Sequence, residues 1–354
     1  MSAAARDNSG TTSVETAHRF DEAALQRWLY GHVADFHGPL SVERFKGGQS
    51  NPTFKLTTPT RSYVLRRKPP GQILRGAHAV EREARVLSAL GQVDFPVAGV
   101  LGLCDDDSVI GSAFFVMEMV EGRVFWDAHF PQVGRDERPA YFDAMNATIA
   151  RLHRIDPIAT GLGDFGKPGN YFARQISRWS RQYWEDTEAG RDADMDWVLE
   201  RLPARIPGDD ETSIVHGDFR CDNLIFHPTQ PEVIAVLDWE LSTLGHPLAD
   251  FVYHAMMYRM PPDIVAGLRG VDLDTANISD EEQYIAAYCR RTGRAAIPDY
   301  DFYVAFNFFR MAAIFHGIKG RVIRGAASST HASERAKSFP KLARLARETL
   351  ESGS

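Results

Sequence analysis

Short stretches of alternating apolar and polar residues dominate the first third of the chain and predict β-strands. The expected strands are Leu40–Phe45, Thr53–Thr57, Ser62–Arg66, Val97–Cys104 and Ala113–Met119. The first two flank a glycine-bearing turn, Gly47–Asn51, which is typical of a hairpin. Two other stretches have helical spacing, Phe20–Val33 and His78–Leu90. We therefore expect residues 20–120 to form a small β-rich lobe, with the helix His78–Leu90 inserted between its strands.

Longer stretches with helical spacing begin after Pro139. The expected helices are Tyr141–Arg154, Tyr171–Glu188, Met195–Leu202, Leu248–Met260, Asp280–Thr292, Phe302–Arg321 and Ala332–Leu350. A β-rich interlude, Ser213–Asp238, interrupts them. Residues 121–354 therefore predict a mainly helical lobe, and residues 1–19, rich in Ser, Thr and Ala, predict a disordered tail. The expected fold class is α+β, with two lobes and a cleft between them.

Composition narrows the class of protein. The chain has 354 residues, 44% hydrophobic and 25% charged, which excludes a mostly disordered, collagenous or coiled-coil protein. The net charge of −7 argues against a nucleic-acid partner, which would require a basic excess. We expect no membrane span, because no apolar run reaches about 18 residues. The N-terminus lacks the apolar stretch of a secretory signal, and three widely spaced cysteines are typical of reduced thiols, so we expect a cytoplasmic protein.

The residues with the clearest chemistry lie in the β interlude. Residues His216–Asn223 have the pattern H-x-D-φ-x-x-x-N, where φ is apolar, which matches the kinase catalytic loop. Two apolar runs follow and predict a hairpin that brings Asp238 back beside Asn223. Phosphoryl transfer requires such a set, because one carboxylate accepts the proton of the attacking hydroxyl while a carboxylate and an amide hold Mg²⁺ on the nucleotide phosphates.

Each of these features also has an ordinary structural explanation. A lone H-x-D is more often a capping or core pair, and Asp238 alone could be a turn residue. The motif, the hairpin and the aspartate that ends the second strand occur together, and this combination favours the functional interpretation.

The sequence resembles the aminoglycoside phosphotransferase and choline kinase-like family of small-molecule kinases, which has the protein-kinase-like fold. The resemblance covers nearly the whole chain after about residue 35. It is strongest to the kinase-like domain fused to some acyl-CoA dehydrogenases. The traits that carry this resemblance are Gly48–Asn51, Tyr63–Arg66, Met117–Gly122 and Ile314–Arg321.

The resemblance implies ATP and Mg²⁺ as the partners of the reaction and a small-molecule hydroxyl as its acceptor. It implies that Asp218 is the catalytic base and that Asn223 and Asp238 are the Mg²⁺ ligands. His216 and Asp250 would support the catalytic loop. One departure is the sequence after Asp238, Trp-Glu instead of Phe-Gly, which is usual for small-molecule kinases and argues against a protein kinase.

The second departure is an arginine, Arg66, at the position expected for the phosphate-binding lysine. Arginine keeps the charge and can bind phosphate with two hydrogen bonds. The neighbouring Arg67 and Lys68 leave the register open. Glu83 would be the helix partner that orients Arg66, and its ordinary explanation is a solvated surface charge.

The remaining nucleotide-binding candidates are weaker alone. The glycine turn supplies Gly48, Ser50 and Asn51, whose backbone N–H groups and hydroxyl could hold phosphates, although a glycine hairpin needs no ligand. Glu118 and Val120, at the end of the last strand, could offer a backbone carbonyl and N–H group to adenine.

The class of acceptor is predicted from the charge of the C-terminal segment. The segment Lys319–Ser354 carries eight basic and three acidic residues, which favours an anionic acceptor such as a hydroxyacyl-CoA over a polycationic aminoglycoside. A solvated helix face would explain the same surplus. Three alternatives remain: a true aminoglycoside phosphotransferase, a nucleotide-binding pseudokinase with a regulatory role, and a metal-dependent hydrolase that uses His216, Asp218 and Asp238. Oligomeric state is not predicted.

Overall fold

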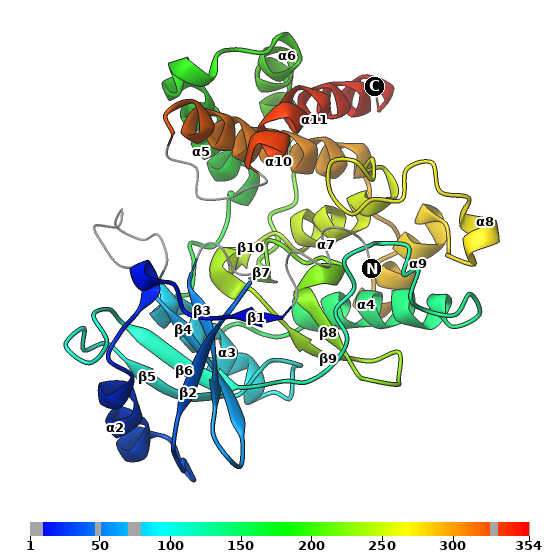
Figure 1. Ribbon diagram of the computed structural model, residues 1–354. Helices are drawn as coiled ribbons and strands as arrows, with labels where there is room; N and C mark the ends of the chain where they lie inside the picture. Colours follow the sequence, from blue (N-terminus) through cyan, green and yellow to red (C-terminus); the bar gives the residue numbers. More distant parts are fainter. Residues whose placement is uncertain (1–9, 47–50, 70–78, 326–331, 354) are drawn as a thin grey trace. The chain divides into compact units, whose positions relative to one another are not determined.

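A computed structural model describes residues 10–46, 51–69, 79–325 and 332–353 (Figure 1). The chain divides into two compact units. The first comprises Met1–Trp126, Ile158–Leu162 and Cys221–Ser242, and the second comprises Asp127–Pro157, Gly163–Arg220 and Thr243–Ser354. Two segments after residue 120, Ile158–Leu162 and Cys221–Ser242, thus group with the first unit.

The first unit contains a six-stranded antiparallel sheet in the order β1-β2-β3-β4-β6-β5. Its strands are β1 (Thr11–Thr12), β2 (Ser41–Phe45), β3 (Thr53–Thr57), β4 (Ser62–Arg67), β5 (Val100–Cys104) and β6 (Phe114–Glu118). The five expected strands are all present within a few residues. The expected disordered tail is wrong at Thr11–Thr12, because these residues pair with Arg44 and Phe45 of β2.

Alternation along the strands separates the two faces of this sheet. Phe54, Leu56, Tyr63 and Leu65 are fully buried in one cluster with helix α2 (Glu22–His32). Arg66 follows Leu65 and therefore points to the opposite face. Helix α3 (Val80–Gly91) packs against β5 and β6 in the same unit. The alternation of side chains along β4 therefore directs the Arg66 cation toward α3 and away from the apolar cluster.

A second hairpin belongs to the first unit, although it lies a hundred residues later in the chain. It consists of β8 (Leu224–Phe226) and β9 (Val233–Val236), with Leu224 opposite Val236. The segment after β6 passes close to it, and a Cβ atom on Gly122 would lie 2.3 Å from the Phe226 carbonyl oxygen. A glycine is therefore required where Arg123 forms a β-bridge with Phe226.

The second unit is mainly helical. Its helices are α4 (Arg138–His153), α5 (Tyr171–Glu185), α6 (Ala193–Arg201), α7 (Pro247–Ala255), α8 (Leu273–Ala276), α9 (Glu281–Thr292), α10 (Tyr300–Ile323) and α11 (Ala332–Ser352). A short two-stranded ladder, β7 (Ser213–Val215) with β10 (Thr243–Gly245), leads into the catalytic-loop segment and into α7. The seven expected helices are all present, and the short α8 was not expected.

Helix α10 is the centre of the second unit and is buried along most of its length. It packs against α5, α7 and α11, and Figure 1 shows α5, α6, α10 and α11 grouped at one end of this unit. A Cβ atom on Gly320 would lie 1.9 Å from an Asp186 carboxylate oxygen, so this glycine permits the close approach of the segment after α5. Across the described residues, no helix combines the length and the apolarity that crossing a membrane requires.

Candidate active site

The backbone of the predicted catalytic loop is fixed by one buried carboxylate. Asp250, in the first turn of α7, accepts hydrogen bonds from the backbone N–H groups of His216 and Gly217, both at 2.7 Å. Gly217 has a φ of +84°, which allows the chain to turn there. Burial alone would raise the pKa of Asp250, but the hydrogen bonds from His153 and His216 outweigh burial and hold it below its ordinary value.

Further contacts surround this loop within the second unit. His153 Nε2 lies 3.2 Å from the Asp250 carboxylate, and His153 Nδ1 lies 2.8 Å from the Tyr288 hydroxyl. Arg310 of α10 donates a hydrogen bond to the Gly217 carbonyl across 2.8 Å. Helix α7, through Asp250, and helix α10, through Arg310, therefore contact the loop, and His153 of α4 supports Asp250.

Asp218 keeps part of its side chain accessible, with 23% of it exposed. Its backbone N–H donates to His216 Nδ1 at 3.1 Å. Tyr253 donates a hydrogen bond to Asp218 Oδ1 at 2.5 Å, and Arg220 Nε lies 3.2 Å from the same oxygen. Burial raises the pKa of Tyr253, so this phenol stays protonated and remains a donor. The carboxylate is thus oriented by a hydrogen bond from a neutral phenol and by an ion pair with a guanidinium group.

A separate ionic group occupies the first unit. Arg66 Nε lies 2.7 Å from Glu83 of α3, and Arg66 Nη2 lies 2.7 Å from Asp238 Oδ1 and 3.6 Å from Glu240. Burial would lower the pKa of Arg66, but these three carboxylates raise it. Burial raises the pKa of Glu83 to about 7, although the charge of Arg66 opposes the shift.

These contacts distinguish Arg66 from the two cations that follow it in sequence. Arg66 pairs with Glu83, as predicted, and the Arg66 side chain is only 9% exposed. Arg67 instead donates to the Ser112 hydroxyl at 3.0 Å, and Lys68 pairs with Glu81. Of these three cations, Arg66 is therefore the one directed at Asp238.

The hairpin brings Asn223 and Asp238 together. The backbone N–H of Leu237 donates to the Asn223 carbonyl across 2.8 Å, next to the β8–β9 pairing. Asp238 adopts a left-handed conformation with φ 62°, which is uncommon for a residue other than glycine. A carboxylate and an amide supply the hard oxygen donors that Mg²⁺ prefers, and Arg66 occupies only one of the two Asp238 oxygens. The donor set therefore fits Mg²⁺.

The structure describes only some of the other nucleotide-binding candidates. Gly48 and Ser50 lie outside the described residues. Asn51 is 1% exposed. The Glu118 N–H donates to the Gly99 carbonyl at 2.9 Å, and its carboxylate pairs with Arg61, so the Glu118 backbone can offer adenine only its carbonyl. Val120 is half-buried.

Sequence reasoning missed three residues that touch the candidate site: Tyr253, Arg310 and Glu240. Tyr253 lies three residues after Asp250 on α7, so helical spacing could have placed it on the same face. Arg310 comes from a helix 93 residues away from Gly217, and no local pattern connects them.

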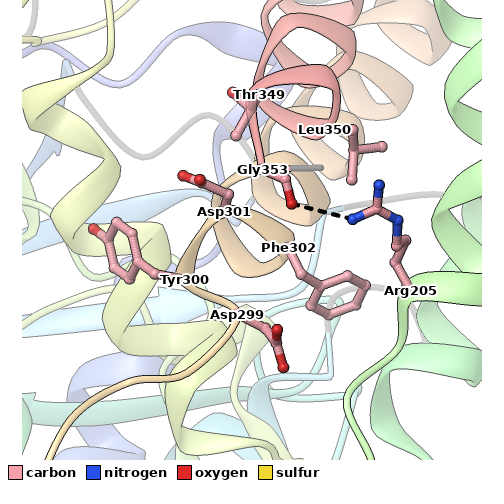
Figure 2. Close-up of a pocket in the computed structure, with 8 residues that line it drawn as sticks. All are labelled: Arg205, Asp299, Tyr300, Asp301, Phe302, Thr349, Leu350 and Gly353. Atoms are coloured by element: carbon pink, nitrogen blue, oxygen red, sulfur yellow. Dashed lines mark hydrogen bonds between the residues drawn. The ribbon is translucent and has the colours of Figure 1, made fainter.

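A cavity of about 240 Å³ lies in the second unit, away from these residues. It is formed where α10 begins and α11 ends, and Figure 2 shows Asp299, Phe302 and Leu350 in its lining. Arg205 donates to the Gly353 carbonyl across 3.3 Å at one side of it. None of the predicted site residues lines this cavity.

Within the described ranges, one group of three His, Cys, Asp or Glu side chains has its ligand atoms within 4.8 Å of one another, namely Asp209, Glu211 and His246. They do not fit one. His246 Nδ1 accepts the backbone N–H of Leu248, so the Nε2 that faces Asp209 carries the proton of the neutral ring. Arg294 already forms a two-hydrogen-bond pair with Glu211. His246 therefore caps the N-terminus of α7.

The basic surplus of the C-terminal segment is largely neutralised inside the second unit. Most of its cations pair with carboxylates, in the pairs Arg324 with Asp186 and Glu188, Lys337 with Glu334, Lys341 with Asp263, and Arg344 and Arg347 with Asp194. Paired charges contribute little to a long-range field. This segment therefore gives weaker support for an anionic acceptor than its composition implied.

Curated relatives cover nearly all of this chain. Acyl-CoA dehydrogenase family member 10 of Mus musculus is 41% identical over 339 residues, which are 95% of this chain and 32% of that protein. Acyl-CoA dehydrogenase family member 11 of Gallus gallus is 43% identical over 347 residues, which are 94% of this chain and 44% of that protein. The chain thus spans less than half the length of these relatives.

Solved structures show the same fold. A crystal structure from Ralstonia eutropha, described as a candidate aminoglycoside phosphotransferase, has 50% identity and a TM-score of 0.87, with 94% of this chain and 99% of that chain covered. Choline kinase from Cryptosporidium parvum has 11% identity and a TM-score of 0.62, covering 94% and 97%. The latter likeness shows the kinase-like fold alone. The model of the phosphotransferase enzyme family matches residues 41–309, and the chain belongs to this family.

Proposed function

We propose that this protein is an ATP- and Mg²⁺-dependent phosphotransferase that acts on a hydroxyl group of a small molecule. The buried ionic group around Arg66 carries the proposal. Glu83 fixes a permanent cation that reaches Asp238, and the residue before Asp238, Leu237, hydrogen-bonds through its backbone N–H to the Asn223 carbonyl. A fixed cation next to hard oxygen donors is the arrangement that the phosphates of a nucleoside triphosphate require.

In the proposed reaction, the acceptor oxygen forms a bond to the γ-phosphorus of ATP while the bond from that phosphorus to the β-phosphate oxygen breaks, which releases ADP. Asp218 accepts the hydroxyl proton, and Tyr253 and Arg220 hold its carboxylate in place. Bound Mg²⁺ would neutralise the charge that develops on the phosphates. Arg66 would bind phosphate oxygens through the guanidinium donors left over from its carboxylate pairs.

The alternatives are less well supported. Asp218, Asn223 and Asp238 are all present with oxygen donors, which argues against a pseudokinase. The hydrolase would need His216 as a metal ligand, but this side chain is fully buried and its Nδ1 accepts the Asp218 N–H. An aminoglycoside acceptor remains the main rival, because the Ralstonia protein is described in those terms.

For the acceptor, we propose an alcohol carried on a coenzyme A thioester. The proposal is supported by the similarity to proteins named as acyl-CoA dehydrogenase family members. This chain matches less than half the length of those proteins. An enzyme that adds a phosphoryl group to a hydroxyacyl chain would prepare that oxygen as a leaving group.

The test is a transfer assay with ATP labelled on the γ-phosphate, run over hydroxyacyl-CoAs, kanamycin, amino alcohols and sugars. We expect labelled product from a hydroxyacyl-CoA and none from kanamycin. Asp218→Asn should lower kcat by about 10²- to 10⁴-fold, the usual contribution of a positioned base. No labelled product from any acceptor, or full activity in Asp218→Asn, would contradict the proposed function.

A further inference from the structure

Helix α5 presents a row of arginines to solvent. Arg174, Arg178 and Arg181 follow one another at spacings of four and three residues, which places them on one face of the helix. Arg178 and Arg181 are exposed, and Arg174 is half-buried. Trp184, three residues after Arg181, is 51% exposed. We call Arg174, Arg178, Arg181 and Trp184 the α5 arginine face.

The charges of this face are not neutralised by the protein. Arg174 donates to the Lys167 backbone carbonyl, and the Arg178 guanidinium lies 4.9 Å from the Trp179 ring centroid. Throughout the described part of the chain, no carboxylate forms an ion pair with Arg174, Arg178 or Arg181, and Glu185 four residues after Arg181 does not pair with it. The C-terminal arginines differ, since Arg344 and Arg347 share Asp194.

The face begins near the β7–β10 ladder that leads into the catalytic loop. Tyr171, the first residue of α5, packs so closely on the β10 end that a Cβ atom on Gly245 would lie 2.7 Å from its ring. Burial raises the pKa of Tyr171, and the charges acting on it include Arg310 and Asp250, which hold the loop, as well as Arg174. At a rise of about 1.5 Å per residue, Arg181 lies about 15 Å farther along the helix axis.

We infer that the α5 arginine face binds the phosphates of a coenzyme A acceptor, with the adenine ring on Trp184. Guanidinium groups bind phosphate with two hydrogen bonds, and a flat base gains from stacking on an exposed indole. The distance along α5 requires a carrier whose phosphates are joined to its reacting group by a long arm, as the pantetheine arm joins them in coenzyme A. This inference rests on the proposed function and adds the binding surface of its acceptor.

Charge complementarity argues against the other ligands of the proposed reaction. A polycationic aminoglycoside would be repelled by three unpaired arginines. The phosphates of ATP have their own cation in Arg66, which belongs to the first unit and is held by Glu83. An acceptor with phosphates and a base matches both the cations and the indole of the α5 arginine face.

Direct binding tests the inference without requiring turnover. Calorimetry should compare the affinity for free coenzyme A of the wild type, the double variant Arg178→Gln/Arg181→Gln and the control Arg344→Gln. The control removes an exposed arginine of the same unit that is already paired with Asp194. We expect the double variant to bind coenzyme A about tenfold more weakly or worse, and the control to bind as the wild type does. The difference should shrink as NaCl shortens the Debye length from about 10 Å at 0.1 M to about 3 Å at 1 M.

A kinetic measurement separates this inference from the proposed function. With a hydroxyacyl-CoA, the double variant should raise the acceptor KM about tenfold and leave kcat and the ATP KM unchanged. With the corresponding hydroxyacyl-pantetheine, which lacks the phosphates and adenine, variant and wild type should be equal. Equal coenzyme A affinity in the wild type and the double variant, or no coenzyme A binding by the wild type, would overturn the inference even if ATP-dependent transfer to another alcohol proved the enzyme active.

Discussion

The Tyr253 hydroxyl donates a hydrogen bond to Oδ1 of Asp218 across 2.5 Å, one helical turn after the residue that fixes the loop backbone. Helix α7 thus holds both the backbone of the catalytic loop and the side chain of the predicted base. Asp250 binds the loop N–H groups, and Tyr253 orients the Asp218 carboxylate. The proposed chemistry depends on this double attachment, because a proton acceptor must be held within hydrogen-bonding reach of the attacking hydroxyl.

Removing the Tyr253 hydroxyl should slow the reaction without weakening substrate binding. A hydrogen bond to a charged group contributes about 1.5–3 kcal/mol, so we expect Tyr253→Phe to lower kcat about 10- to 100-fold. Steady-state kinetics should show both KM values within about twofold of wild type, as expected for an interaction that serves the transition state. A variant with raised KM values and normal kcat would instead make Tyr253 a substrate contact.

Substitutions at Arg66 should separate charge from geometry. Arg66→Met leaves Glu83 and Asp238 without their shared cation and should raise the ATP KM about tenfold or more, because a charge-assisted contact is lost. Arg66→Lys keeps the charge and should lose less. Arg67→Met is the matched control, since Arg67 contacts Ser112 instead. Nucleotide affinity measured by calorimetry should fall only in the Arg66 variants, and a fall in Arg67→Met alone would reverse the assignment.

Burial of Glu83 predicts a pH-dependent stability. Its pKa in the folded protein is about 7, above the ordinary value of 4.5, so the folded state takes up this proton first on acidification. The contribution of Glu83 to the free energy of unfolding should therefore fall as pH rises from about 4.5 to about 7 and stay constant above that. Glu83→Gln cannot titrate and should lack this loss. Urea unfolding with EDTA at pH 5 and pH 8 measures it, and an identical pH dependence in both proteins would show that Glu83 is not the source.

Gly122 should be intolerant of even one extra carbon. Gly122→Ala would place a Cβ atom 2.3 Å from the Phe226 carbonyl oxygen and 2.4 Å from an Ile225 methyl carbon, so the β8–β9 hairpin must shift. Overpacking of this kind costs about 1–3 kcal/mol of unfolding free energy. Gly208→Ala is the control, because nothing lies within 4 Å of its Cβ position. Equal melting temperatures for the two variants would contradict the close approach at Gly122.

Local pattern predicted the elements well because each residue pair involved is close in sequence. Alternation located β2 to β6 and explains why Arg66 and Leu65 lie on opposite faces of β4. The pairing of Arg66 with Glu83, by contrast, was implied by the family resemblance. The apolar runs around residues 227–231 predicted the hairpin that joins Asn223 to Asp238. These features require only the periods of strands and helices.

Contacts between distant segments could not be predicted in this way. The return of Cys221–Ser242 to the first unit and the pairing of Thr11–Thr12 with β2 depend on tertiary packing. Charge counting also failed to separate free cations from paired ones. The basic surplus of the C-terminal segment is paired with Asp186, Asp194 and Asp263 from elsewhere in the chain. The arginines of α5, by contrast, did not stand out in the composition.

The Mg²⁺-dependent transfer of the γ-phosphoryl group by Asp238→Ala tests the central claim most directly. Of the two predicted metal ligands, Asp238 is the one that carries a charge, and it also pairs with Arg66. Turnover with saturating ATP and the best acceptor should fall by about two orders of magnitude or more, as when a group that stabilises developing charge is removed. The melting temperature without nucleotide should stay near that of the wild type, which establishes that the variant is folded. A folded Asp238→Ala protein with undiminished Mg²⁺-dependent turnover would contradict the account.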